Sequence, residues 1–455
     1  MVKVRIDKVK NTQQLNRHIS VYYLIKGCTL MGKVSFFTIC KAISGTITDS
    51  SFVERVKTIP SAFTRIRKMP FCDTMWFIMS CTNRSVQTEL DDYFQKKGTE
   101  SVSRQAFAKK REEVKPEAFV ELNDLLIQKF ESEDTEIATY CGYRLFGVDG
   151  TLIDLPNTTA MREQFGYSTN SSDRQYAKGL AITAFDVLNK LTIFAKLYRY
   201  DDSEKRRIHD IVDVFAETYT QKSIWLLDRG YPSLDLFARF EQNKQNYVIR
   251  VSSHSLKEIN NATGADQMVT ITRGAVTIKV RVVNILLSSG ESEKLVTNLF
   301  DELTPDELKE LYHKRWAIET NYRFLKRNTY LEVFTGESVT AVLQDFYSSI
   351  LVLNMATIVE REQDEVLANN NAVCTDGKNK GCKYRPNRTK IIADIKRDFV
   401  KLMLCDGKII RIFKQLRLYR NVKRYAYLDI PNRQFSRGIV KSSGNRRATH
   451  PKQAL

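Results

Sequence analysis

The sequence lacks any run of about eighteen apolar residues, and no hydrophobic signal core follows Met1. Neither a membrane span nor secretion is therefore expected. The eight cysteines are scattered without a close CxxC pair, which favours reduced thiols in a cytoplasmic protein over a disulfide or zinc framework. The five histidines are dispersed, and none lies near a Ser or Cys in a pattern that indicates a catalytic triad.

Acidic residues are scarce at both ends of the chain. Residues 1–70 contain 13 Lys and Arg against 3 Asp and Glu, and residues 376–455 contain 22 against 5, with no Glu. Since the formal net charge of all 455 residues is +18, the central 71–375 carries −9. Basic ends around an acidic centre favour a protein that grips nucleic acid. A charge distribution that serves only solubility is the alternative interpretation.

The first third of the chain contains predicted helices. Phe71–Met79 is apolar on most sides and predicts a buried helix, and Ser85 suits the N-cap of the next one. Ser103 is expected to cap a basic helix that carries Arg104 and Lys109. Helix, short turn and basic helix form the outline of a helix-turn-helix DNA reader. A solvated surface helix explains the same pattern equally well.

From residue 143 the hydrophobic pattern changes to a period of two. Strands are predicted over 143–155, 177–188, 191–200, 223–228 and 246–252, and helices over 203–219 and from 232. Three strands, helix, strand, helix, strand is the ribonuclease H-like order, a mixed sheet with helices on both faces. Residues 253–300 are rich in Val, Ile and Thr and predict a β insertion, and one long helix is predicted over 304–326.

The last part of the chain is predicted to be a polar linker followed by basic helices. The linker is 367–384, the helical stretches lie near 387–404 and 409–420, and the last dozen residues are expected to be disordered. Three domains follow from this pattern: a helical N-terminal DNA-binding region over 1–140, an α/β catalytic domain over 141–365, and a basic C-terminal region for DNA binding or dimerisation over 366–455.

Four residues within the predicted long helix carry a distinctive chemistry. Tyr312, Arg315, Glu319 and Lys326 are spaced 3, 4 and 7 apart, so one continuous helix would project them all from a single narrow face. An acid flanked by cations suits a metal-ligating carboxylate beside phosphate contacts. A surface ion pair between Arg315 and Glu319 is the structural alternative.

These four residues spell Tyr-x2-Arg-x3-Glu-x6-Lys, which resembles the signature of bacterial insertion-sequence transposases of the DDE type. The nearest branch is the cut-and-paste group that includes the composite kanamycin- and tetracycline-resistance transposons. Further motifs match in the family's order; they are Val148–Thr151 with Leu155–Thr158, Leu227–Tyr231, and Thr297–Leu299. With a weaker likeness over 63–119, the resemblance extends from about residue 63 to 350.

The resemblance implies a ribonuclease H-like catalytic domain in which Asp149, Asp228 and Glu319 are the catalytic acids. They would hold two Mg²⁺ or Mn²⁺ ions, cleave the DNA ends by hydrolysis and transfer the freed 3′-OH ends to target DNA. Carboxylate oxygens suit these hard ions, and the sequence offers no His and Cys cluster for zinc. The implied partners are double-stranded DNA, as terminal inverted repeats and target, and a second copy in a synaptic homodimer.

The resemblance also implies DNA contacts near these acids. Tyr312 and Arg315 would bind DNA-end phosphates, and Lys326 would lie near the cleaved strand. Trp316 is expected either to pack internally or to touch DNA. Close relatives form hairpin ends, and related hairpin formers expose a base to a Trp in the β insertion; residues 253–300 contain no Trp, so the hairpin step stays open. The expected location is the cytoplasm, in association with the nucleoid.

The sequence offers two further residues near these motifs and two alternative functions. Asp154 lies five residues past Asp149, on the opposite strand face, and is the weaker candidate for the first acid. Trp225 is expected in the core. A transposase-derived DNA-binding protein without catalysis is disfavoured by the intact acids, and a plain ribonuclease H-like nuclease by the β insertion and the basic ends.

Overall fold

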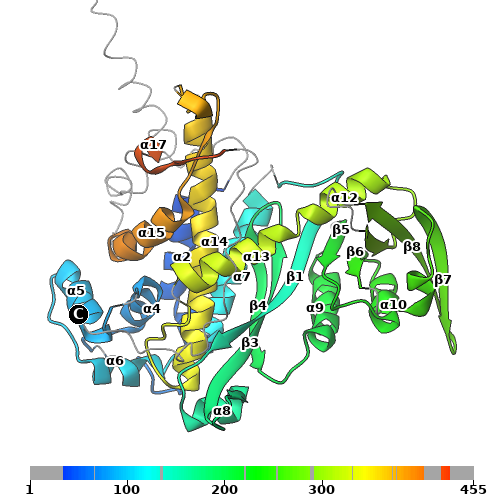
Figure 1. Ribbon diagram of the computed structural model, residues 1–455. Coiled ribbons are helices and arrows are strands. Elements are labelled where there is room, and N and C mark those ends of the chain that lie inside the picture. Colours follow the sequence, from blue (N-terminus) through cyan, green and yellow to red (C-terminus); the bar gives the residue numbers. More distant parts are fainter. Residues whose placement is uncertain are drawn as a thin grey trace, which may run out of the picture. The chain divides into compact units, whose positions relative to one another are not determined.

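The protein was analysed as a computed structural model (Figure 1). The structure describes residues 34–65, 67–82, 84–133, 137–219, 222–252, 255–286, 292–329, 331–370, 372–375, 377–403 and 422–430. It divides into two compact units. The first combines the described parts of 1–136 and 325–455, and the second is 137–324.

The second unit is a mixed α/β structure built on one sheet. Its strands are β1 (Arg144–Asp154), β2 (Tyr167–Thr169), β3 (Gln175–Asp186), β4 (Leu191–Arg199), β5 (Ser223–Leu227), β6 (Asn246–Val251), β7 (Asp266–Arg273), β8 (Val276–Leu286) and β9 (Ser292–Thr297). The order along the sheet is β2-β3-β1-β5-β6-β9-β8-β7, and β4 pairs with β3. Only the β1–β5 and β5–β6 pairs are parallel, so most of the sheet is antiparallel.

The helices of this unit are α8 (Thr159–Phe165), α9 (Glu204–Thr218), α10 (Leu234–Gln242), α11 (Lys257–Asn260), α12 (Pro305–His313) and α13 (Trp316–Asn328), whose last four residues belong to the first unit. Helices α9 and α10 confirm the helices predicted over 203–219 and from 232, whereas α8 and α11 were not predicted. Figure 1 shows α9 and α10 beside β5 and β6. Apolar residues of α9, among them Ile211 and Phe215, are fully or almost fully buried, and Trp225 of β5 is 0% exposed, as expected for a core residue.

The predicted β insertion is confirmed, and it enlarges the main sheet. Strand β9 pairs antiparallel with β6, and β8 and β7 follow at the edge. The predicted strands 177–188 and 191–200 are confirmed as β3 and β4. They form an antiparallel hairpin in which Gly179 pairs with Arg199 and Asp186 pairs with Leu191. Lys190 has a φ of 57°, the left-handed conformation that a tight two-strand turn requires.

The predicted single helix over 304–326 is wrong. The chain forms α12 and α13 with a turn between them at Lys314 and Arg315. Here the amides of Arg315 and Ile318 donate to carbonyls three residues back, at 3.0 and 3.1 Å. Such three-residue hydrogen bonds tighten the backbone relative to an α-helix, so the angles of one straight helix do not apply across this turn.

The first unit is helical. Its α-helices are α2 (Phe36–Thr48), α3 (Ser50–Val56), α4 (Phe71–Ser80), α5 (Val86–Lys97), α6 (Arg104–Arg111), α7 (Glu117–Glu133), α14 (Val339–Asn369), α15 (Arg388–Met403) and α17 (Val422–Tyr425), with short strands β10 (Tyr384–Arg385) and β11 (Tyr427–Leu428). The expected buried helix α4 and the Ser85 and Ser103 caps are confirmed. The weak periodicity before residue 60 did not reveal α2 and α3.

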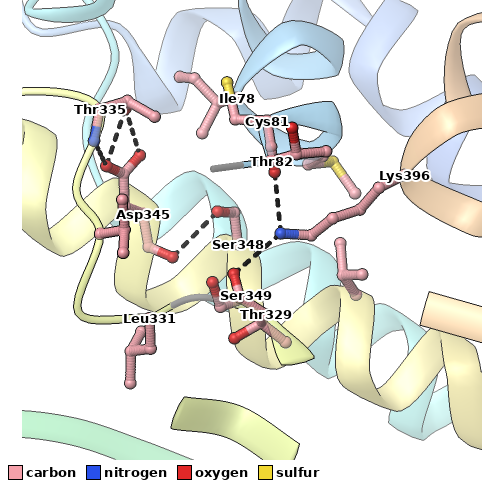
Figure 2. Close-up of a pocket in the computed structure, with 13 residues that line it drawn as sticks. Ile78, Cys81, Thr82, Thr329, Leu331, Thr335, Asp345, Ser348, Ser349 and Lys396 are labelled. Atoms are coloured by element: carbon pink, nitrogen blue, oxygen red, sulfur yellow. Dashed lines mark hydrogen bonds between the residues drawn. The ribbon is translucent and has the colours of Figure 1, made fainter. Parts of the chain in front are cut away.

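The first unit joins segments that the sequence assigned to separate domains. Helix α14 continues through the expected boundary at 365/366, and α15 packs on α4 and α14. Lys396 of α15 is buried and donates to the carbonyls of Cys81, at 2.9 Å, and Thr329, at 3.0 Å. Figure 2 shows this lysine at a cavity of about 20 Å³, room for about one water molecule. Buried polar bonds of this kind tie the basic C-terminal helix to the N-terminal helices.

The remaining C-terminal predictions meet the structure only in part. Within the predicted linker 367–384, Val373 and Lys383 form an antiparallel bridge, and Gly377–Asn379 is a 3₁₀ turn. Helix α15 confirms the predicted stretch near 387–404. The predicted helix near 409–420 and the last dozen residues lie outside the described part of the chain.

Helix α14 is the one described helix that is long and apolar enough to cross a membrane. Its apolar window is 83% buried inside the structure. Asn354 and Thr357 of this helix are fully buried, and Asn354 donates to Asn123 Oδ1 at 2.8 Å. Burial against other helices explains its apolar composition, as in the central helix of a helical core.

Candidate active site

The first two acids stand at the same level on neighbouring parallel strands. Gly147 of β1 pairs with Leu226 of β5. Asp149 follows Gly147 by two residues, and Asp228 follows Leu226 by two residues. Because side chains alternate between the two faces of a sheet, both acids project from the same face. Adjacent strands lie about 4.8 Å apart, so the sheet brings together two carboxylates that are 79 positions apart in the sequence.

The third acid reaches this edge from α13. A Cβ placed on Gly147 would lie 3.7 Å from Cδ1 of Ile318, so α13 covers the face of β1 to which Asp149 belongs. Glu319 follows Ile318 in the first turn of α13. The negative charge of Glu319 contributes to the raised pKa of Asp149, so the two carboxylates interact electrostatically. The sequence motifs thus meet at one end of β1 and β5.

A tyrosine of α13 fastens the helix beside the first acid. Tyr322, one turn after Glu319, is buried, and its hydroxyl donates to the backbone carbonyl of Asp149 at 2.5 Å. The same hydroxyl accepts a hydrogen bond from Thr183 Oγ1 of β3 at 3.0 Å. These bonds fix the rotation of α13, and with it the direction of Glu319.

Two arginines hold the second and third acids. Arg315 NH2 lies 2.9 Å from Glu319 Oε1, and Arg250 of β6 lies 2.8 Å from Asp228 Oδ1. Arg250 also pairs with Glu293 of β9 at 2.9 Å. Burial by itself raises the pKa of Asp228, but the hydrogen bond from the Arg229 amide and the two arginine charges outweigh it. The pKa of Asp228 therefore lies below its ordinary value.

The first acid has the opposite electrostatic environment. Burial, followed by the charge of Glu204, raises the pKa of Asp149 to about 7. The Gly150 amide, which donates to Asp149 Oδ1 at 3.0 Å, and the charge of Arg315 offset this only in part. Asp149 is therefore buried in surroundings with excess negative charge, which a bound cation would stabilise.

The donor set of this site suits a divalent cation. Asp149, Asp228 and Glu319 offer only carboxylate oxygens, the ligands that Mg²⁺ and Mn²⁺ prefer. In the residues that the structure describes, no three His, Cys, Asp or Glu side chains lie close enough to form a metal site as they stand. Asp228 and Glu319 each form an ion pair with an arginine instead.

The predicted DNA contacts occupy different positions around these acids. Arg315 is 4% and Tyr312 7% exposed, so both side chains lie inside the unit. Trp316 is 46% exposed, which excludes the packed alternative, and the Arg315 guanidinium lies 5.8 Å from the centre of its ring. Lys326 lies on α13 beyond the residues of the second unit, 3.5 Å from Glu332. The sequence also predicted, as an alternative to metal and phosphate binding, an ion pair between Arg315 and Glu319. The structure contains this ion pair.

The predicted basic helix borders a groove of the first unit. The groove has a volume of about 800 Å³ and lies between the segment 61–69 and α6. Its basic lining residues are Arg65, Arg67, Lys68, Lys109 and Lys110. Lys109 is exposed, and so is Arg104 at the start of α6. The structure therefore gathers five basic side chains where the sequence suggested only a basic helix.

The weaker candidate for the first acid takes part in a different interaction. Asp154 lies at the far end of β1, 3.3 Å from Lys178 of β3. Asp154 and Lys178 are register partners on these antiparallel strands, which explains the contact. This placement leaves Asp149 as the acid beside Asp228.

Sequence reasoning missed three residues of the site: Glu204, Arg250 and Tyr322. Each is distant in sequence from the acid that it contacts or influences, and none forms part of a recognised motif. A charged residue within the apolar strand 246–251 was a usable signal for Arg250, because such a side chain needs a partner.

Comparison with known proteins gives the family of this region. Residues 140–355 match the family described as "Transposase DDE domain". A probable transposase for insertion sequence element IS5377 of Geobacillus stearothermophilus is 26% identical over 136 residues, which are 27% of this chain and 36% of that protein. A putative transposase for insertion sequence element IS4SA of Synechocystis sp. is 25% identical over 143 residues, 30% of this chain and 40% of that protein. The chain thus spans less than half the length of these curated relatives.

Among solved structures, the chain is similar to that of a piggyBac transposase synaptic complex with hairpin DNA. The likeness has a TM-score of 0.41 and 11% sequence identity, and it covers 94% of this chain and 88% of the other.

Proposed function

We propose that this chain, whose residues 140–355 match the transposase DDE domain family, acts as a bacterial insertion-sequence transposase that binds and cleaves DNA ends and joins them to target DNA. Asp149, Asp228 and Glu319 are the catalytic acids in this proposal. One observation carries it: three acids from three separate motifs meet at the end of two parallel strands, within the matched residues 140–355.

Two Mg²⁺ or Mn²⁺ ions bound by these three carboxylates would activate the attacking water or 3′-OH and stabilise the leaving oxygen of an in-line displacement. The chain's own part is to hold the carboxylates in place. Tyr322 orients α13 and Glu319, and Arg250 keeps Asp228 ionised. No protein nucleophile is required, because water and then the DNA 3′-OH are the attacking groups.

The surroundings of the acids supply candidate DNA contacts. Trp316 is exposed beside Arg315 and offers an aromatic face to a base. Arg315 suits a bidentate contact with a phosphate, but Glu319 holds it at 2.9 Å. Glu319 and a DNA phosphate would therefore compete for this guanidinium. Tyr312 and Lys326 complete the proposed set, on the same two helices.

We assign DNA-end binding to the first unit as well. The groove with Lys109 has a volume of about 800 Å³ and is lined by five basic side chains, which suit a phosphodiester backbone, and Arg104 lies exposed on the same helix. The N-terminal helical region and the basic C-terminal region would act together here, since α15 packs on α4. A homodimer would hold two terminal inverted repeats, in the cytoplasm with the nucleoid; a hairpin intermediate stays a secondary hypothesis.

The fold of the catalytic domain is proposed to be ribonuclease H-like. The strand neighbours β4-β3-β1-β5-β6, with β1, β5 and β6 parallel and β3 antiparallel to β1, support this. The edge strands β9, β8 and β7 would then be an insertion between β6 and the helix of the third acid.

The test uses the purified full chain, a linear donor DNA with the element's terminal inverted repeats, and Mg²⁺. We expect strand cleavage at the ends, and loss of cleavage with retained DNA binding in Glu319→Gln. Asp306→Asn is the control, because this acid is exposed in the first turn of α12. Cleavage by Glu319→Gln at the wild-type rate would remove Glu319 from the site. DNA binding without any metal-dependent cleavage would favour a DNA-binding protein.

A further inference from the structure

A fourth carboxylate lies against the first acid's motif. Glu204 begins α9, and a Cβ on Gly150 would overlap its carboxylate group and lie 2.7 Å from its Cγ. Gly150 directly follows Asp149. The absence of a side chain at this position thus lets Glu204 approach the backbone next to the first acid.

A tyrosine of the second-acid motif holds Glu204 in this place. The hydroxyl of Tyr231 donates to Glu204 Oε2 at 2.9 Å, and Tyr231 is 3% exposed. The Tyr231 amide donates to the Asp228 carbonyl at 3.1 Å, so the turn after the second acid sets the position of this ring. Glu204 therefore connects the Asp149–Gly150 and Asp228–Tyr231 motifs from a third element, α9.

The partners of Glu204 lie outside its own helix. Its side chain accepts a hydrogen bond from Tyr231, which follows the second acid. Within the described residues neither Glu204 nor Asp149 forms an ion pair with an arginine or lysine, while Glu319 and Asp228 each have an arginine. The two acids without a cation are thus neighbours.

We propose that Glu204 is a fourth carboxylate of the active site, which Tyr231 holds over Gly150 so that it binds a divalent cation together with Asp149. This inference rests on the proposed metal-dependent function and adds a residue to it. Glu204 would supply further carboxylate oxygens beside those of Asp149. Tyr231 would be a positioning residue, since it acts through Glu204.

The experiment measures Mn²⁺ binding to the full chain without DNA by titration calorimetry. In Glu204→Gln we expect the Mn²⁺ affinity to fall more than about 10-fold, and in Tyr231→Phe by about 10-fold. Gly150→Ala keeps every charge but displaces the Glu204 carboxylate, so it should weaken Mn²⁺ binding too. Glu217→Gln is the matched control, because Glu217 is an exposed acid of the same helix, and its Mn²⁺ affinity should equal that of the wild type.

The outcomes separate this inference from the proposed function. Equal Mn²⁺ affinities of Glu204→Gln and Glu217→Gln would overturn the role of Glu204, even where the wild type cleaves DNA with Mg²⁺. Loss of affinity in Glu204→Gln but not in Gly150→Ala would also overturn it, since charge alone would then explain the effect. If the wild type binds Mn²⁺ through Glu204 but cleaves no donor DNA, the proposed function fails and the metal site stands.

Discussion

The Tyr322 hydroxyl donates a hydrogen bond to the backbone carbonyl of Asp149 across 2.5 Å and so joins α13 to β1 at the first acid. Because Tyr322 follows Glu319 by three residues, the two side chains lie on adjacent positions of the helix surface. The bond therefore fixes the third acid relative to the first without involving either carboxylate.

Tyr322→Phe should lower the rate of DNA cleavage with little change in DNA binding. The variant keeps the ring but loses the bonds to Asp149 and Thr183, so the free energy of unfolding should fall by about 1 kcal/mol. Urea unfolding and donor cleavage measure the two effects. Tyr167→Phe is the control, because Tyr167 is 41% exposed. Cleavage by Tyr322→Phe at the wild-type rate would contradict the orienting role.

Asp149→Asn should stabilise the metal-free protein at pH 8 but not near pH 4. The folded state raises the pKa of Asp149 from 3.8 to about 7, so folding favours its protonated form. The stability from this group is present below pH 4 and is lost as the pH rises through 7. Thermal melting in EDTA at several pH values measures it, with about 2–4 °C expected for each kcal/mol. A pH-independent difference between variant and wild type would contradict the raised pKa.

Arg250→Met should move the acid limb of the cleavage profile to higher pH. Arg250 helps to hold the pKa of Asp228 below its ordinary value, so its loss lets Asp228 take up a proton at a higher pH. Donor cleavage between pH 4 and 8 measures the shift. Arg273→Met is the control, because Arg273 at the end of β7 forms an ion pair with Glu258 of α11 and contacts none of the three acids. An unchanged acid limb would show that Arg250 does not set the ionisation of Asp228.

Substitution of the groove cations should weaken DNA binding and flatten its salt dependence. The double variant Arg67→Ala/Lys109→Ala removes two exposed groove residues, and each lost phosphate contact reduces the slope of log affinity against log salt by about 1. Fluorescence anisotropy with donor DNA at several salt concentrations measures it. Lys41→Ala is the control, since Lys41 is exposed on α2 and does not line the groove. A slope equal to that of the control would exclude the groove as the DNA contact.

The sequence by itself determined the local elements and the identity of the motifs. The alternation from residue 143 gave the correct order of strands, because a half-buried strand needs apolar side chains at every second position. The motifs with Asp149, Asp228 and Glu319 indicated a DDE transposase, and residues 140–355 match the transposase DDE domain family. Short-range caps such as Ser85 and Ser103 were predictable too, because their partners lie within one turn of helix.

Only the tertiary structure decided how distant segments combine. The residues on both sides of Arg315 favour helix, but a turn at Arg315 interrupts the expected long helix. In this turn the backbone amides donate to carbonyls three residues back, whereas an α-helix requires carbonyls four residues back. Tyr322, Tyr231 and Glu204 joined the site through contacts between segments up to 173 positions apart. Lys396 of the basic C-terminal helix α15 has a buried amine that needs hydrogen-bond acceptors. It donates to backbone carbonyls of the first unit and so binds α15 to the N-terminal helices. The hydrophobic periodicity of a sequence depends on residues within one helix or strand. Contacts between distant segments do not affect this periodicity, so the sequence pattern cannot predict them.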